Sequence, residues 1–209
     1  VPLYKLIGGK FTNEIPLRGS VGIDTPEKMA ADARRIIDAG FKGIKMKVGL
    51  EPVIDVDRVK AIRAAIGRDA VIDIDVNGAY APKDAIWVLQ AVSDCVPILV
   101  EQPVRRDDLE GLALVRRSVN RPIGACESAL TLAEVSRVIQ MGAADFFNFK
   151  IDRSGGIFWG KHAIKMIEAA GLFAVASEQL GFGVAVAAQA ATQGAASIRR
   201  LRRDATLIF

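Results

Sequence analysis

The sequence predicts a TIM-type (β/α)7β barrel, in the α/β class, and three observations lead to this fold class. Helical and extended patterns alternate with a repeat of roughly 25 to 30 residues, which is typical of β-α units in a parallel sheet. No low-complexity segment or linker divides the 209 residues. Hydrophobic residues make up 51% of the chain and aromatic residues only 6%, so Ala, Val, Ile and Leu are expected to build one large core.

The first three units each combine a strand pattern with a helix pattern. They are predicted, strand then helix, at 15–21 and 26–39, at 43–49 and 53–66, and at 70–76 and 82–93. Thr25 followed by Pro26 is typical of a helix start, because threonine caps the first turn and proline suits its first position. Gly40 and Gly67 mark the ends of the first two helices.

Four further units follow at 98–101 and 109–119, 122–126 and 132–141, 145–150 and 157–170, and 172–176 and 184–201. An eighth strand is represented only by an apolar stub at 205–209. We therefore expect a barrel that is incomplete at its C-terminus.

Composition and charge exclude several classes of protein. The formal net charge is +4, and four arginines within 199–203 account for it, so no basic face interleaved with aromatic residues suggests nucleic-acid binding. Cys95 and Cys126 are the only cysteines, which favours a reducing, cytoplasmic compartment over a disulfide framework. No signal peptide is expected, and the uncharged stretch at 179–198 is too polar for a membrane span.

Lys45 and Lys47 are separated by one residue within an apolar run that has the pattern of a buried strand. Because side chains alternate along a strand, both lysines leave it on the same side. Burying two ammonium groups side by side is costly unless carboxylates or a metal ion surround them. Either the pair takes part in chemistry, or both side chains reach water at the mouth of the barrel.

Acidic residues close three consecutive predicted strands, at the end of the barrel where such enzymes place their functional groups. Asp73, Asp75 and Asn77 alternate at the end of the third strand, Glu101 ends the fourth and Glu127 follows the fifth. Like charges that converge on a small volume need a cation, and carboxylate oxygens suit Mg²⁺. Each carboxylate taken singly has a second interpretation, as the N-cap of the next helix.

Lys150 ends the sixth predicted strand, and Gly155-Gly156 follows in the next loop. Lys150 is expected to enter the barrel mouth opposite the lysines of the second strand. The glycine pair permits a tight turn and leaves backbone amides free at the next helix start. A metal ion flanked by lysines on opposing faces can bind a carboxylate substrate and stabilise an enediolate while one lysine removes the α-proton.

Four motifs occur in order: Lys45-Met46-Lys47, Asp75-Val76-Asn77-Gly78, Glu101-Gln102-Pro103, and Lys150 with Gly155-Gly156. Together they resemble the enolase superfamily, in its muconate lactonizing enzyme (muconate cycloisomerase-like) subgroup, nearly end to end over the barrel. The mandelate racemase subgroup uses a barrel histidine as base, whereas His162, the single histidine here, lies in a predicted helix.

The resemblance implies a mandelate racemase/muconate lactonizing enzyme-like isomerase or lyase with Mg²⁺ as cofactor and Mn²⁺ as an alternative. It also implies a small carboxylate substrate and a homo-oligomer, with neither nucleic acid nor membrane as a partner. Lys47 and Lys150 would be the acid/base pair, and Lys45 would tune the pKa of Lys47. The remaining implied site residues are Asp75, Glu101 and Glu127 as metal ligands, and Asn77, Cys126 and Glu178 in supporting or substrate-binding roles.

Two features depart from the family pattern. Members commonly read Ala-Asp-Glu-Ser after the fifth strand, whereas this chain has Cys126 in the aspartate position. A thiol is a poor ligand for Mg²⁺, so either Glu127 takes that place, or the metal binds weakly, or a softer ion is used. Residues 1–13 resemble the connection to the family's N-terminal capping domain, which is expected to be absent, and residues 14–209 form the predicted catalytic barrel.

Two functions are left open by the sequence. The first is Mg²⁺-dependent abstraction of the proton α to a carboxylate, with racemisation or epimerisation, cycloisomerisation or syn-dehydration as the outcome. The second is a non-catalytic barrel, excised or decayed, that binds a ligand or partner without turnover. The second function would account for Cys126 and for the missing capping domain.

Overall fold

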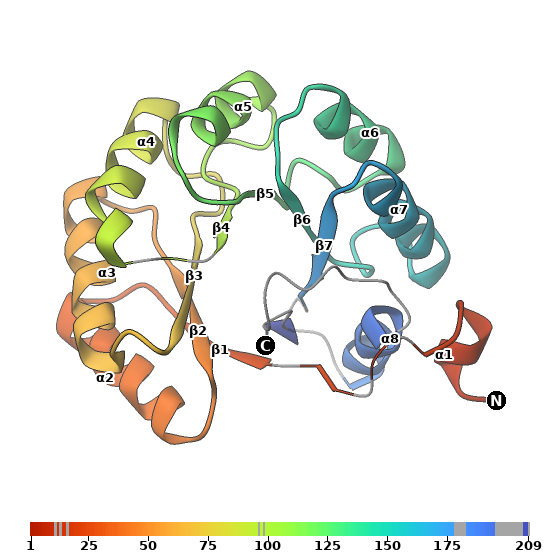
Figure 1. The fold of residues 1–209 in the computed structure, drawn as a ribbon, viewed down its shortest axis with the longest axis horizontal. Helices are drawn as coiled ribbons and strands as arrows, with labels where there is room; N and C mark the ends of the chain where they lie inside the picture. Colours follow the sequence, from red (N-terminus) through yellow and green to blue (C-terminus); the bar gives the residue numbers. More distant parts are fainter. Residues whose placement is uncertain are drawn as a thin grey trace.

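A curved parallel sheet forms the inside of the protein, and helices wrap its outer face (Figure 1). The structure is a computed structural model that describes residues 1–10, 12, 14–15, 17–95, 97, 99–177, 183–194 and 207–208. The strands are β1 (Leu17–Val21), β2 (Gly43–Lys47), β3 (Val71–Asp75), β4 (Leu99–Glu101), β5 (Ile123–Ala125), β6 (Phe146–Phe149), β7 (Phe173–Ala176) and β8 (Leu207–Ile208).

The strands are hydrogen-bonded in the order β7-β6-β5-β4-β3-β2-β1-β8, and every pair is parallel. The predicted barrel class is therefore confirmed, and each predicted strand overlaps an observed one. The C-terminal stub contributes β8, which pairs with β1 through Leu17 with Leu207 and Arg18 with Ile208.

The helices alternate with the strands as the sequence predicts. They are α1 (Leu3–Leu6), α2 (Pro26–Asp38), α3 (Pro52–Ile66), α4 (Pro82–Ala91), the 3-10 turn η1 (Ser93–Cys95), α5 (Leu109–Ser118), α6 (Leu132–Gln140), α7 (Ile157–Ala169) and α8 (Gly183–Gly194). Thr25 caps α2 as expected, since its side chain accepts the N–H of Lys28. The sequence patterns missed α1 and η1, which are too short to show a helical period.

The predicted extension of the last helix to residue 201 and the arginine cluster lie outside the described residues. Within the described part of the chain, no helix combines the length and the apolar character that a membrane span requires.

Alternation along the strands divides their side chains between two environments. Ile44 and Met46 on β2, and Ile72 and Ile74 on β3, are buried in the main core that includes the helices. The opposite face of the same strands points into the barrel. There Leu99, Phe146 and Val175 form a separate apolar cluster, against which Phe173 packs.

A buried ion pair completes the barrel interior beside this cluster. Arg18 on β1 binds Asp73 on β3 with an Nε–Oδ2 distance of 3.1 Å, and both side chains are buried. Burial raises the pKa of Asp73, and the Arg18 guanidinium offsets only part of that effect. Asp73 and Leu99 each come two residues before an acidic strand end, Asp75 and Glu101. The pair and the apolar cluster therefore form the floor beneath the candidate site.

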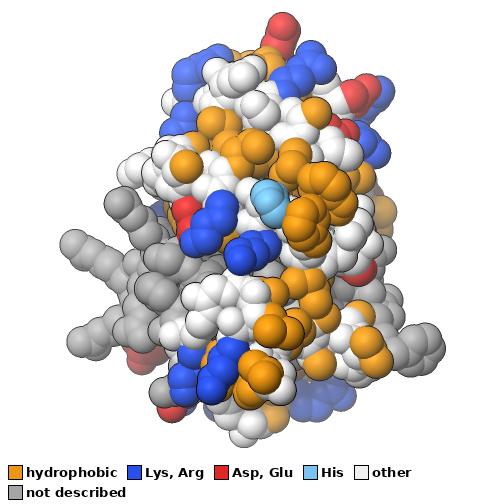
Figure 2. Space-filling model, turned by 90° about the vertical axis from the view of Figure 1, so that its right-hand side faces the viewer, with side chains coloured by type: hydrophobic (Ala, Val, Ile, Leu, Met, Phe, Trp, Pro, Cys, Tyr) orange, Lys and Arg blue, Asp and Glu red, His pale blue; other side chains and the backbone are white. Residues whose placement is uncertain are grey.

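One exposed apolar face lies on α7, which Figure 2 shows as hydrophobic side chains gathered around the pale blue histidine. Phe158 and Trp159 are 64% and 50% exposed, and their rings pack edge to face at 5.1 Å between centroids. His162 contacts Phe158 with 4.5 Å between ring centroids. His162 thus lies in a helix on the outside of the barrel, as the sequence predicts.

Gly124 on β5 is required by the floor of the barrel. A Cβ atom at this position would lie 2.2 Å from Cζ of Phe146. We predict that Gly124→Ala lowers the free energy of unfolding by about 1–3 kcal/mol, because Phe146 is fully buried and has no room to move. Urea titration measures this change. Gly22→Ala is the matched control, since nothing lies within 4 Å of its added Cβ, and equal stability of the two variants would contradict the prediction.

Candidate active site

Lys45 lies at the centre of a buried ionic cluster. Its Nζ is 2.8 Å from Oδ2 of Asp75 and 2.5 Å from Oε2 of Glu101, and the lysine side chain is only 5% exposed. Burial disfavours its charge, but the two carboxylates outweigh burial and raise the pKa of Lys45 above its ordinary value. The interpretation in which both lysine side chains reach water is therefore wrong for Lys45.

Lys47, two residues further along β2, binds the same Asp75 carboxylate as Lys45. Its Nζ lies 2.5 Å from Oδ2 of Asp75 and donates to Oδ1 of Asn77 at 2.7 Å, with 32% of the side chain exposed. The backbone N–H of Asn77 donates to Asp75 Oδ1 at 3.1 Å. Burial would raise the pKa of Asp75, but Lys45 and Lys47 lower it below its usual value. Both oxygens of Asp75 thus have partners within the chain.

A second group of ligand atoms lies beside the lysine cluster, at the ends of β4 and β5. Cys126 Sγ and one carboxylate oxygen each from Glu101 and Glu127 all lie within 4.8 Å of one another. Asn148 donates to Glu101 Oε2, and Asn77 donates to Glu127 Oε1 at 2.9 Å. The structure therefore brings Glu101, Glu127 and Cys126 together, while Asp75 belongs to the lysine cluster.

This second group fits a divalent cation. Glu101 Oε1 and Glu127 Oε2 are buried and have no hydrogen-bond partner among the described residues. A buried, unpaired carboxylate oxygen is unfavourable unless a cation or proton neutralises it. Burial, together with the charges of Glu101 and Glu127, raises the pKa of the Cys126 thiol well above its ordinary value. Without a metal ion the sulfur is therefore protonated.

Lys150 follows β6 directly, two residues beyond the buried Asn148. Asn148 faces the barrel interior, where it donates to Glu101, and alternation predicts the same side for Lys150. Strands β2 and β6 form opposite walls of the curved sheet, with β3, β4 and β5 between them (Figure 1). Lys47 thus lies on one wall of the mouth, and Lys150 directly follows the strand of the opposite wall. Glu178, the remaining predicted site residue, lies outside the described residues.

Sequence reasoning did not single out two side chains that shape this site. Asn148 is one of them, and the alternation that pairs Lys45 with Lys47 applies equally to Asn148 and Lys150 and could have found it. Gln102 is the other. Sequence reasoning assigned Gln102 no role beyond its place in the Glu101-Gln102-Pro103 motif. Its role depends on a left-handed backbone conformation, with φ of 39°, which the sequence pattern does not predict.

The Gln102 amide holds the loop that carries Cys126. Its Oε1 accepts the backbone N–H groups of Cys126 and Ser128 at 2.9 and 3.1 Å. Its Nε2 donates to Ser128 Oγ and to the carbonyl of Val104 at 2.8 and 2.9 Å. All four bonds are buried, so Gln102 is a positioning residue for the candidate ligands.

A comparable anchor lies after β2. Asp55 on α3 is fully buried and accepts the backbone N–H of Gly49 at 2.9 Å, two residues beyond Lys47. Tyr80 Oη and Arg58 Nη1 also donate to this carboxylate, at 2.7 and 2.8 Å. Burial and the neighbouring Asp55 raise the pKa of Tyr80, which keeps its hydroxyl a donor. The loop that follows Lys47 is therefore fixed by the buried Asp55 carboxylate.

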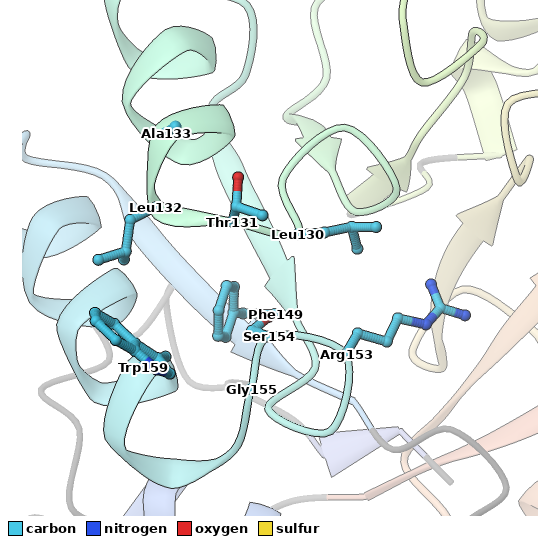
Figure 3. Close-up of a pocket in the computed structure, with 9 residues that line it drawn as sticks. All are labelled: Leu130, Thr131, Leu132, Ala133, Phe149, Arg153, Ser154, Gly155 and Trp159. Carbon is cyan, nitrogen blue, oxygen red and sulfur yellow. The ribbon is translucent and has the colours of Figure 1, made fainter.

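Two cavities open beside the site. One, of about 580 Å³, is lined by Asn77, Gly78, Arg105, Arg106, Asp107 and Glu127, and its two arginines are paired with Asp107 and Glu134. The other, of about 490 Å³, lies between the loops that follow β5 and β6 (Figure 3). Its lining is mostly apolar: Leu130, Leu132, Ala133, Phe149 and Trp159, with Thr131, Arg153, Ser154 and Gly155.

We predict that Gln102→Ala lowers the free energy of unfolding by about 1–3 kcal/mol, because it leaves buried N–H groups of the Cys126 loop without an acceptor. Gln90→Ala is the matched control, since Gln90 is exposed and makes one marginal bond of 3.5 Å to the carbonyl of Ser118. Urea unfolding of both variants measures the difference. A Gln102→Ala protein as stable as the control would show that water replaces the amide without loss.

Comparison with known proteins identifies the family of this chain. Residues 28–207 match the family model described as enolase C-terminal domain-like. A hydrophobic dipeptide epimerase of Enterococcus faecalis is 38% identical over 209 residues, which cover 99% of this chain and 58% of that protein. An L-Ala-D/L-Glu epimerase of Bacillus subtilis is 34% identical over 215 residues, covering 100% of this chain and 58% of that protein. The chain therefore spans somewhat more than half of each relative.

A solved structure shows the same fold. The dipeptide epimerase of Enterococcus faecalis, in complex with Mg and the dipeptide L-Leu-L-Tyr, superposes with a TM-score of 0.93 at 35% identity, covering 99% of this chain and 57% of that one. The resemblance inferred from the four motifs is confirmed by the family match. This chain belongs to the enolase C-terminal domain-like family of the enolase superfamily.

Proposed function

We propose that this barrel catalyses abstraction of the proton α to a carboxylate and its return to either face, and that its substrates are dipeptides. The proposal is supported by Lys47, which lies in the mouth against Asp75, and by Lys150, which follows the strand of the opposite wall two residues beyond the inward-facing Asn148. Epimerisation needs a proton acceptor on each face of the α-carbon, and two lysines on opposing walls meet this need.

The proton inventory of the reaction balances between the two lysines. The lysine that faces the α-hydrogen acts as a neutral amine and takes the proton, while the ammonium of the other lysine donates a proton to the opposite face. Lys47 and Lys150 exchange these roles when the other epimer binds. Lys45 stays an ammonium held by Asp75 and Glu101, so its role is to fix the charge and position of those carboxylates.

The proposed cofactor is a divalent cation, with Mg²⁺ and Mn²⁺ as the family candidates. Bound by Glu101 and Glu127, with Asp75 as a proposed third ligand, it would bind the substrate carboxylate and stabilise the negative charge that develops there. The unpaired oxygens of Glu101 and Glu127 support this role. Asp75 would give up one of its present partners to take part, because both of its oxygens are engaged.

Dipeptides are favoured by the relatives and by one of the cavities. Two relatives are named for dipeptide epimerisation, and a third, an L-Ala-D/L-Glu epimerase of Clostridium acetobutylicum, is 40% identical over 75% of this chain. The apolar pocket beside the Lys150 loop, between Leu130 and Trp159, suits an apolar side chain.

Other expectations stay predictions. They include the homo-oligomeric state, the cytoplasmic location, the division at residue 13 and the supporting roles of Asn77 and Glu178. The non-catalytic barrel is the competing function, and the experiment below separates the two.

The test is exchange of the α-hydrogen in deuterated buffer with Mg²⁺ or Mn²⁺, followed by NMR on a panel of apolar and acidic dipeptides, amino acids and hydroxy acids. We expect deuterium at the α-carbon together with inversion for at least one dipeptide. Lys150→Ala should stop inversion and leave exchange only in the epimer whose α-hydrogen faces Lys47. Lys42→Ala, at an exposed lysine just before β2, should change neither. No exchange across the panel would favour the non-catalytic barrel.

A further inference from the structure

We propose that the barrel mouth binds a thiophilic divalent cation of the zinc class in preference to Mg²⁺, through Cys126 Sγ, Glu101 and Glu127. The inference rests on the proposed function only for the presence of a cation in this place. Its ligand set comes from the side chains of this chain. It would make Cys126 a metal ligand where relatives commonly have aspartate.

The carboxylates available to a cation limit the choice of ligands. Asp75 Oδ2 is bound by both Lys45 and Lys47, and Asp75 Oδ1 accepts the backbone N–H of Asn77. Glu101 Oε1 and Glu127 Oε2 are the carboxylate oxygens of this cluster that are buried without a partner among the described residues. Two carboxylates alone make an incomplete site, and Cys126 is the neighbour whose ligand atom lies within 4.8 Å of both without breaking an existing ion pair.

Cys126 is positioned for this role. Its sulfur lies within 4.8 Å of an oxygen of each glutamate, and its backbone N–H is held by Gln102. Glu101, only 3% exposed, presents an unpaired oxygen in the same cluster, so the cysteine does not stand alone. A buried unpaired carboxylate oxygen beside a thiol is the arrangement expected of a metal site.

The chemistry of sulfur sets the metal preference. When the metal–sulfur bond forms, the S–H proton passes to solvent, and the thiolate then carries the single negative charge that aspartate would supply. Thiolate binds Zn²⁺ and Co²⁺ strongly, whereas Mg²⁺ prefers oxygen ligands in an octahedral set. One thiolate and two carboxylates leave a coordination position open, as in catalytic rather than structural zinc sites.

Cobalt(II) is the probe that reports sulfur ligation directly. We expect titration with Co²⁺ to produce a sulfur-to-metal charge-transfer band in the near ultraviolet, which Cys126→Ser abolishes. Cys95→Ser is the matched control, because Cys95 is equally buried but lies in η1, outside the ligand cluster, and its variant should keep the band. The wild-type band and this control do not depend on how the Cys126 variant folds.

Isothermal titration calorimetry with Zn²⁺ and with Mg²⁺ measures which cation the site binds more tightly. The wild-type protein should bind Zn²⁺ more tightly than Mg²⁺, and Cys126→Asp should gain Mg²⁺ affinity. Co²⁺ binding without a charge-transfer band, or equal Mg²⁺ affinity of the wild type and Cys126→Asp, would overturn the proposal. Neither measurement uses turnover. If the protein shows the charge-transfer band but no α-hydrogen exchange, the metal site stands and the proposed function fails. If it shows α-hydrogen exchange but no band, the proposed function stands and the thiolate site fails.

Discussion

The buried ammonium of Lys45 is the interaction on which the rest of the site depends. It joins β2 to β3 and β4 by contacts with Asp75 and Glu101 in a space from which water is excluded. Removing such an ion from water costs several kcal/mol, and only well-placed opposite charges offset that penalty. The requirement explains why acidic residues close the two neighbouring strands. It also determines which oxygens are left for other partners.

From this centre a chain of polar contacts crosses the mouth. Asp75 holds Lys47, Lys47 donates to Asn77, and Asn77 donates to Glu127 at the end of β5. At the end of this chain of contacts, Glu101 and Glu127 each have a carboxylate oxygen within 4.8 Å of Cys126 Sγ. The floor beneath, formed by Arg18 with Asp73 and by the Phe146 cluster, keeps these ligand atoms at the open end of the barrel. The candidate ligands are thus confined to the strand ends.

Much of this arrangement follows from strand periodicity. Alternation predicts that Lys45 and Lys47 share a face, and the parallel order brings Asp75 and Glu101 to the same edge, which the register confirms by pairing these two residues. Alternation does not predict which side chain each carboxylate binds. That Asp75 binds both lysines, and that Glu101 rather than Asp75 shares the cysteine cluster, depends on side-chain rotamers across strands. The role of Gln102 also escapes sequence reasoning, because it arises from a left-handed residue at the strand end.

The stability of Lys45→Met tests the central claim most directly. Replacing the ammonium leaves Glu101 with an uncompensated buried charge and deprives Asp75 of one of its two lysines, so we expect the free energy of unfolding to fall by about 3–5 kcal/mol in urea titrations at neutral pH. Adding Glu101→Gln to that variant should restore part of the loss, because it removes the charge that has lost its partner. A Lys45→Met protein as stable as the wild type would contradict the account, since the Lys45 ammonium would then not be what holds the carboxylates in place.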